Sequence, residues 1–86
     1  MRLIKRYSNR KLYDTTERHY INLSDIADYV RKGDEIQVVD YVTSATLTAQ
    51  TLAQVIFEEE KKSPHFSADV LINIIKSSTP QRSQST

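Results

Sequence analysis

The chain has no cysteine, one glycine and two prolines among its 86 residues. The lack of cysteine excludes disulfide bridges, cysteine-ligated zinc sites and thiol catalysis, and so few glycines and prolines exclude collagen-like and low-complexity chains. Long apolar runs are also missing, since no uninterrupted apolar run, including residues 70–72, is longer than three residues. The sequence therefore predicts neither a membrane span nor a signal-peptide core. The start at Met1 without an apolar leader favours a cytoplasmic protein.

Enough apolar residues remain for one small folded domain. Leu, Ile, Val and Phe together number 22 of the 86 residues. This share is above the roughly 20% below which chains tend to stay disordered. At this length a single thin core is expected, not two.

The charges are distributed unevenly along the chain, although the formal net charge is only +1. Residues 1–18 carry six basic and two acidic side chains, whereas residues 19–60 carry two basic and eight acidic ones. Residues 61–86 are again basic, with four cations and one acid. A basic end joined to an acidic body is suited to presenting that end to a polyanion.

The strand-forming residues predict two hairpins after an extended segment at residues 2–7. Residues 12–13 and 19–23 flank a polar turn and are expected to form the first hairpin. Residues 36–41 and 45–47 are expected to form a second one through Thr43 and Ser44, although this turn lacks the usual Gly or Asn.

Three helices are predicted from capping residues and apolar spacing. The first covers residues 24–32 and ends at Gly33, the second runs from Thr48 to Lys62, and the third ends near Ser77. The predicted N-terminal caps are Ser24, Thr48 and Ser67.

These elements predict an α+β fold, in which a small antiparallel sheet of two hairpins is packed by two helices and followed by a C-terminal helix. Residues 1–62 are expected to form the domain, residues 63–77 to add the last helix, and residues 78–86, which contain no apolar side chain, to be a disordered tail. The predicted core consists of Leu12, Ile21, Leu23, Ile26, Val30, Val39, Leu52 and Ile56.

Catalysis and metal binding are poorly supported by the sequence. His19 and His65 lie in different predicted elements, whereas a metal site needs three or four converging ligands. Gly33 is a helix stop and does not belong to a phosphate-binding loop, and Asp14 and Asp40 are read as turn and strand-end residues. We therefore expect no enzyme activity and no cofactor.

The basic N-terminal segment is the strongest functional signal from the residues themselves. Lys and Arg contact phosphates, Asn can pair with adenine, and Tyr can bond a phosphate or stack. Two other interpretations stay open: the cations could protect an edge strand from aggregation, and the tyrosines could belong to the core. We assign Tyr13 and Tyr20 to packing. The predicted DNA-contacting residues are Arg2, Lys5, Arg6, Asn9, Arg10 and Lys11.

The segment KRYSNRKLYDT resembles the N-terminal DNA-binding domain of polyhydroxyalkanoate synthesis regulators. The resemblance covers roughly residues 2–62, and its most specific positions are Tyr7, Asn9, Arg10, Leu12, Tyr13, Asp14 and Thr15. It implies that residues 1–62 are a DNA-binding domain of a bacterial cytoplasmic repressor. Members of this family bind promoter DNA of granule-associated protein genes and release it when the polyester accumulates.

The chain departs from the family pattern at two places. Thr43-Ser44 stands where the family usually has Thr-Gly, and residues 64–75 resemble only the opening of a longer region associated with polymer granules. The resemblance therefore implies double-stranded DNA as a partner more strongly than it implies polyester sensing, which belongs to longer relatives. The alternative function is a small interaction module that binds a protein or a granule surface without sequence-specific DNA binding.

The third predicted helix carries too many apolar residues for one buried stripe. Asp69, Asn73 and Lys76 leave only a narrow polar sector, and a chain of this length has little core to surround the helix. We expect the helix to bury part of its surface against a second subunit in a homo-oligomer. The predicted oligomerisation residues are Val70, Leu71, Ile72, Ile74 and Ile75.

Overall fold

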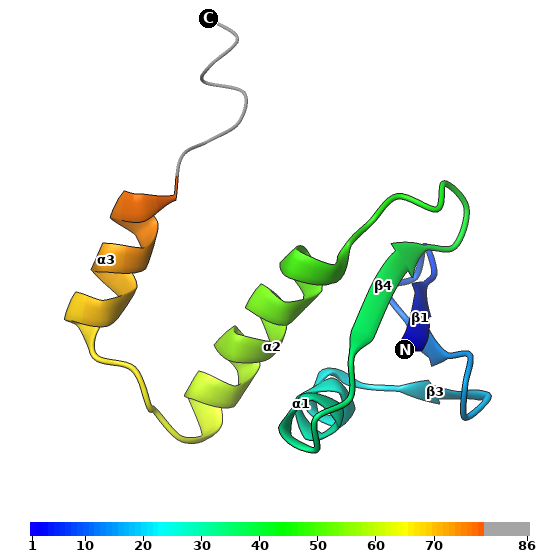
Figure 1. The fold of residues 1–86 in the computed structure, drawn as a ribbon, viewed down its shortest axis with the longest axis horizontal. Coiled ribbons are helices and arrows are strands. Elements are labelled where there is room, and N and C mark those ends of the chain that lie inside the picture. Colours follow the sequence, from blue (N-terminus) through cyan, green and yellow to red (C-terminus); the bar gives the residue numbers. More distant parts are fainter. Residues whose placement is uncertain (79–86) are drawn as a thin grey trace, which may run out of the picture.

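This computed structural model describes residues 1–78, which form one mixed sheet of four strands and three helices (Figure 1). The first helix lies between the third and fourth strands in the chain, and the other two helices follow the fourth strand. The predicted α+β class is confirmed. The predicted tail at residues 78–86 lies outside the described residues, except for Ser78. The elements are β1 (Arg2–Arg6), β2 (Leu12–Asp14), β3 (His19–Ile21), α1 (Leu23–Arg31), β4 (Ile36–Asp40), α2 (Thr48–Lys62) and α3 (Ala68–Ser77).

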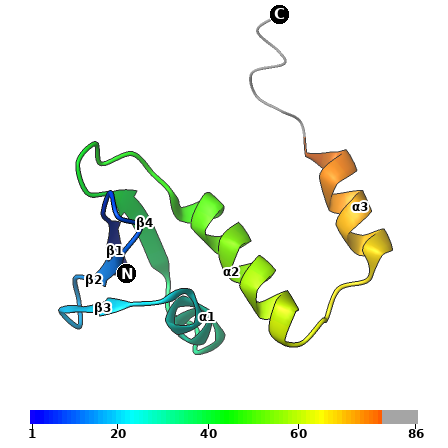
Figure 2. The same ribbon diagram turned by 180° about the vertical axis from the view of Figure 1, so that it is seen from behind.

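The sheet is mostly antiparallel but contains one parallel pair that the sequence did not predict. The strand order is β3-β2-β1-β4, with β1 antiparallel to β2 and parallel to β4 (Figure 2). Instead of a second hairpin of two full strands, only an isolated bridge joins Val39 to Thr46 after the turn. The first strand of the chain is therefore a central strand and not an edge.

The helix boundaries follow the prediction to within one residue, but two of the three predicted caps are wrong. Asn22, not Ser24, caps α1, because its side chain accepts a hydrogen bond from the Asp25 N–H while the Asp25 carboxylate accepts one from the Asn22 N–H. Thr48 is the first residue of α2, and its hydroxyl bonds the Val38 N–H of β4. The third predicted cap is confirmed, since the Ser67 side chain accepts from the Val70 N–H.

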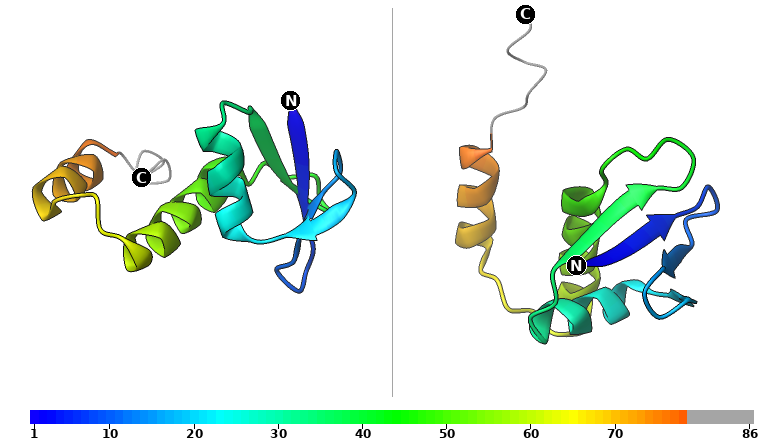
Figure 3. Two further views of the ribbon diagram at one scale, coloured as in Figure 1. Left: turned by 90° about the horizontal axis from the view of Figure 1, so that it is seen from below. Right: turned by 45° about the vertical axis from the view of Figure 1, so that its right-hand side comes forward.

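The core lies between one face of the sheet and the helices α1 and α2, which both lie on that side (Figure 3). Side chains alternate across a strand, so Ile4 and Val38, which are paired in register, both point to the helices and are fully buried. The core also includes Leu12, Ile26, Ala27, Tyr29 and Val55, with Ile21, Leu23, Ile36, Leu47 and Leu52 partly buried around it.

Two residues predicted for the core are exposed. Val30 and Ile56 keep 46% and 45% of their surface in solvent, because the helix faces that carry them turn away from the sheet. Val39 is half-buried but lies on the opposite side of β4 from Val38, which is the face that no helix covers.

Two turns share one geometry, and each is built around an aspartate. The Asp14 carboxylate accepts hydrogen bonds from the N–H groups of the residues two and three positions later, and the Asp40 carboxylate does the same. In both turns the residue four positions after the aspartate donates its N–H to the backbone carbonyl of that aspartate. This residue has a positive φ, which is 64° at Arg18 and 63° at Ser44. This left-handed conformation favours glycine, which explains the Gly that the resembled family usually carries at the position of Ser44.

Helix α3 stands apart from the sheet and from α1 in every view (Figures 1, 2 and 3). All its residues are exposed, including the apolar side chains of Ile74 and Ile75, at 55% and 69%. No helix within residues 1–78 has the length and apolar character needed to cross a membrane.

Candidate nucleic-acid interface

The turn between β1 and β2 presents the predicted basic segment at one end of the sheet. Tyr7 and Lys11 close the turn, with the Tyr7 N–H donating to the Lys11 carbonyl at 2.9 Å. Asn9 stabilises the turn from within, because its Oδ1 accepts the Lys11 N–H at 3.0 Å. Only the amide nitrogen of Asn9 is then left to donate to a ligand.

Arg10 occupies a strained position in this turn. Its φ is 67°, in the left-handed region that costs an L-residue about 1–2 kcal/mol and that usually holds glycine. The chain nevertheless has an arginine here, and its side chain is exposed. Backbone strain of this kind concentrates at functional sites.

Lys5 lies on a central strand, which removes one alternative interpretation of the basic segment. Cations that block aggregation belong on edge strands, whereas β1 is paired on both sides. Lys5 is in register with Tyr13 on one side and Val39 on the other, so it projects from the middle of the uncovered face.

Arg6 lies next to the turn but points to the helix side of the sheet. It lines a shallow hollow together with Arg10 and with Phe57 and Glu58 of α2, while Arg10 and Lys11 line a neighbouring hollow. Arg6 is also in register with Asp40. The backbone N–H groups of the turn that Asp40 starts lower the pKa of that carboxyl, and the charge of Arg6 contributes to the shift.

The structure brings Arg6, Asn9, Arg10 and Lys11 together around one end of the sheet, and Lys5 precedes Arg6 in β1 but projects from the uncovered face. Within residues 1–78, none of these four cations forms an ion pair with a carboxylate. Their positive charge is therefore available to an external anion.

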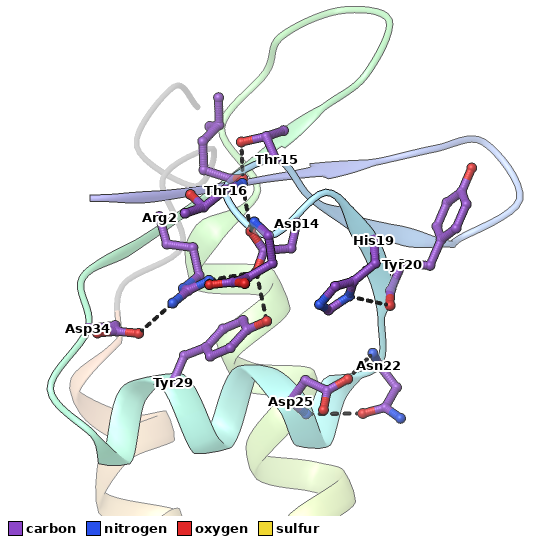
Figure 4. Close-up of polar contacts among 12 residues, drawn as sticks. Arg2, Asp14, Thr15, Thr16, His19, Tyr20, Asn22, Asp25, Tyr29 and Asp34 are labelled. Carbon is purple, nitrogen blue, oxygen red and sulfur yellow. Dashed lines mark hydrogen bonds and ion pairs between the residues drawn. The ribbon is translucent and has the colours of Figure 1, made fainter.

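Arg2 is separated from the other predicted contact residues by its own ion pairs. Its guanidinium bonds Asp14 at 2.7 Å and Asp34 at 3.0 Å, lies 3.6 Å from Glu17, and covers the Tyr29 ring at 3.9 Å from the ring centre (Figure 4). Only 15% of its side chain is exposed. We therefore leave Arg2 out of the interface, because its charge is already satisfied by carboxylates that hold the start of β1.

Asp14 is the centre of this cluster and is fully buried. Its Oδ2 accepts both the Arg2 guanidinium and the Tyr29 hydroxyl, each at 2.7 Å. Burial alone would raise the pKa of Asp14, but the hydrogen bonds from Tyr29, from the turn N–H groups and from Arg2 lower it overall. Burial and the bond to Asp14 raise the pKa of Tyr29 to about 12, so the phenol keeps the proton that it donates.

Four tyrosines gather on the sheet face that no helix covers, and we call Tyr7, Tyr13, Tyr20 and Tyr41 the tyrosine face. The Tyr7 ring contacts the other three, with ring centres 6.5 Å from Tyr13, 6.2 Å from Tyr20 and 4.2 Å from Tyr41. The Tyr13 and Tyr20 rings meet edge to face at 5.2 Å. Burial, followed by the neighbouring phenols, raises the pKa of Tyr7.

The assignment of Tyr20 to packing is wrong, and that of Tyr13 holds only in part. Tyr20 is 59% exposed and points away from the Asp14 cluster (Figure 4). Tyr13, in register with Tyr20, is half-buried on the uncovered face. The signal was available in the sequence: each tyrosine alternates with an inward-facing residue of its strand, Leu12 or Ile21.

Catalytic and metal-binding features are weak in the described part of the chain. No group of three or more His, Asp or Glu side chains within residues 1–78 is arranged to hold a metal ion. His65 lies 3.6 Å from Glu60 on the surface, while His19 bonds a neighbouring carbonyl.

Comparisons with known proteins point to one family. The family described as the PHB/PHA accumulation regulator DNA-binding domain matches residues 3–63. A protein of Allochromatium vinosum described as uncharacterized is 42% identical over 76 residues, which cover 87% of this chain and 50% of that protein. A Thiocystis violacea protein described as lying in the phbA 5′ region is 41% identical over 76 residues, which cover 87% of this chain and 55% of its own length. The chain thus spans about half the length of these curated relatives, and no solved structure matches it.

Proposed function

We propose, from the premise that this chain belongs to the family of PHB/PHA accumulation regulator DNA-binding domains, that it acts as a transcriptional repressor on double-stranded DNA. The family is one of DNA-binding regulatory domains and not of enzymes. The targets in this proposal are promoters of genes for polyhydroxyalkanoate granule-associated proteins, and the place of action is the cytoplasm. Granule association enters the proposal only for longer relatives.

We call the turn from Tyr7 to Lys11, between β1 and β2, the basic turn. This turn and the end of β1 supply the proposed DNA contacts, which are Lys5, Arg6, Asn9, Arg10 and Lys11. The observation that carries this assignment is the cluster of four cations, Lys5, Arg6, Arg10 and Lys11, none of which forms an ion pair with a carboxylate within residues 1–78. Unpaired cations that gather in this way are suited to contact phosphates and guanine edges.

Salt dependence gives the proposal a quantitative signature. Each phosphate neutralised by a cation contributes about −0.9 to the slope of log affinity against log salt concentration. Four cations per copy should therefore make binding strongly salt-dependent. A protein-binding module without DNA contacts would show no such slope with a DNA probe.

The chain offers a matched pair of variants for the test. Arg10 and Arg18 both have a left-handed backbone, with φ values of 67° and 64°, but they lie in the turns at opposite ends of β2. Arg10→Gly and Arg18→Gly remove the same charge and relieve the same backbone strain. We expect Arg10→Gly to weaken binding to promoter DNA by about tenfold or more and to make the salt slope about 0.9 shallower per copy.

Arg18→Gly should leave DNA binding nearly unchanged, and neither variant should be less stable than the parent chain. Fluorescence anisotropy with promoter and random duplexes measures both affinities, and a thermal melt measures stability. Equal losses of affinity in the two variants would remove Arg10 from the interface. An absence of DNA binding by the parent chain would favour the alternative interaction module.

We further propose that α3 joins two copies into a dimer. Its apolar residues 70–72, 74 and 75 are all exposed, and its charges lie near opposite ends at Asp69 and Lys76. In an antiparallel pair of identical helices, Asp69 of one copy lies opposite Lys76 of the other, so the charges as well as the apolar residues are complementary. Such a pair brings two basic turns together, as dimeric repressors commonly do.

Sedimentation of the full chain tests this dimer. Replacing Leu71 and Ile75 together by Lys should give a monomer with an unchanged thermal midpoint, because neither residue contributes to the buried core. Lys76→Glu should weaken the dimer by placing acids opposite each other, and adding Asp69→Lys should restore it. A monomeric parent chain at micromolar concentration would overturn the proposal.

A further inference from the structure

The uncovered face of the sheet is chemically unlike the covered one. Its strand residues, inferred from alternation in the register, are Leu3, Lys5, Tyr13, Tyr20, Gln37 and Val39, and none of them is acidic. The two strand aspartates, Asp14 and Asp40, belong to the alternate set, which shares the face of the buried Ile4 and Val38. The uncovered face is thus neutral to positive in a chain that carries eleven acids.

The tyrosines on this face are only partly explained by packing. Tyr7 and Tyr13 are half-buried and cover the strands beneath them. Tyr20 and Tyr41, at opposite margins of the cluster, keep 59% and 52% of their surface in solvent. Two exposed rings contribute little to the stability of the domain, but they present two hydroxyl groups to an external ligand.

Lysines accompany both exposed rings. The Lys5 Nζ lies 5.9 Å from the Tyr41 ring centre, and the Lys11 Nζ lies 5.7 Å from that of Tyr20. Lys11 also belongs to the basic turn, so the tyrosine face continues directly into the proposed DNA contact. Paired cations and phenol donors without acids are the groups that proteins direct at phosphate oxygens.

We propose that the tyrosine face lies against the sugar–phosphate backbone of the duplex that the basic turn contacts, with the Tyr20 and Tyr41 hydroxyls donating hydrogen bonds to phosphate oxygens. This inference rests on the proposed function and extends it from a turn to a sheet surface. The sheet itself, with Lys5 at its middle, then becomes part of the DNA-binding surface.

The test separates hydroxyl contacts from charge contacts. The double variant Tyr20→Phe and Tyr41→Phe keeps both rings and removes both hydroxyls. We expect it to bind a random-sequence duplex about tenfold more weakly per lost hydroxyl, with an unchanged thermal midpoint and an unchanged salt slope, because a neutral hydroxyl releases no counterion. Lys5→Gln should lower both the affinity and the slope. Phe66→Leu, which alters an exposed aromatic residue outside this face, should lower neither.

The outcomes distinguish this inference from the proposed function. If Arg10→Gly weakens binding while the double tyrosine variant binds like the parent, the tyrosine face is not a DNA contact although the proposed function stands. If the double variant changes the sedimentation coefficient without changing DNA affinity, the face covers a second copy and the inference is wrong. If the parent chain binds no DNA, both the inference and the proposed function fail.

Discussion

Replacing Asp14 by Asn keeps the size of the side chain and removes the negative charge of a fully buried carboxylate. The carboxylate accepts four hydrogen bonds: one from Arg2, one from Tyr29 and two from turn N–H groups. An asparagine oxygen can keep the two backbone bonds, but its NH2 group would then face the donors of Arg2 and Tyr29.

The expected loss of folding free energy is large for a domain of this size. Breaking a buried ion pair by removing one partner costs about 3–5 kcal/mol. We expect about 3 kcal/mol, the lower end, because Arg2 keeps 15% exposure and two further acids beside it. About 60 folded residues have a total stability of roughly 3–9 kcal/mol, so the variant should lose about a third or more of its folding free energy.

Asp40→Asn is the matched control, because Asp40 forms the same turn without a buried arginine or tyrosine partner. The asparagine oxygen at this position can accept hydrogen bonds from both turn N–H groups, so the loss of folding free energy should be much smaller than for Asp14→Asn. Urea unfolding followed by circular dichroism measures both variants. If Asp14→Asn were no less stable than Asp40→Asn, the buried cluster would not contribute to stability as described.

Further variants test acid stability, the turns and the core. The pKa of Asp14 is lowered in the folded state relative to an unfolded value of about 3.9, so its stabilising contribution should be complete above about pH 5, decline as the pH falls below 3.9, and be lost as the pH passes through the lower folded-state pKa. Thermal midpoints recorded from pH 7 to pH 3 should show the onset of this loss, and Asp14→Asn should reduce it. Ser44→Gly should raise the free energy of unfolding by about 0.5–1 kcal/mol, since it relieves a φ of 63° at the expense of a more flexible unfolded chain; a destabilised variant would contradict this account of the turn. Ile4→Ala should cost about 2–5 kcal/mol in chemical denaturation, and Leu3→Ala, which faces the other side of β1, should cost clearly less.

Local signals predicted the helices well, because capping and periodicity act over a few residues. The sequence identifies Ser67 as a cap but not Asn22, because Ser24, two positions later, satisfies the same sequence rule. The hairpin between β2 and β3 was also predicted, since its polar turn joins neighbours in the chain.

Long-range arrangements were not predictable in the same way. The parallel pairing of β1 with β4 depends on how α1 returns the chain to the sheet, and no residue of either strand encodes that partner. The contact between Arg2 and Asp34 follows from this pairing, since the start of β1 comes to lie beside Asp34 only when β4 is in place. The tyrosine face could have been inferred from alternation, but only after the strands had been assigned to a single sheet.

The central place of β1 has a consequence for how the domain forms during synthesis. Strand β1 is synthesised before the other elements of this domain, yet its parallel neighbour β4 is completed only at Asp40, and α2, which covers the sheet, only at Lys62. Until β4 has emerged, one side of β1 has unpaired backbone hydrogen-bonding groups. Until α2 has emerged, the β1–β2 hairpin that carries the basic turn is not held in its final orientation. A ribosome-bound nascent chain therefore cannot present the complete proposed DNA-binding surface before about residue 62 has emerged. Because these non-local contacts must close before the sheet is stable, the domain should fold more slowly than a helical bundle of equal length.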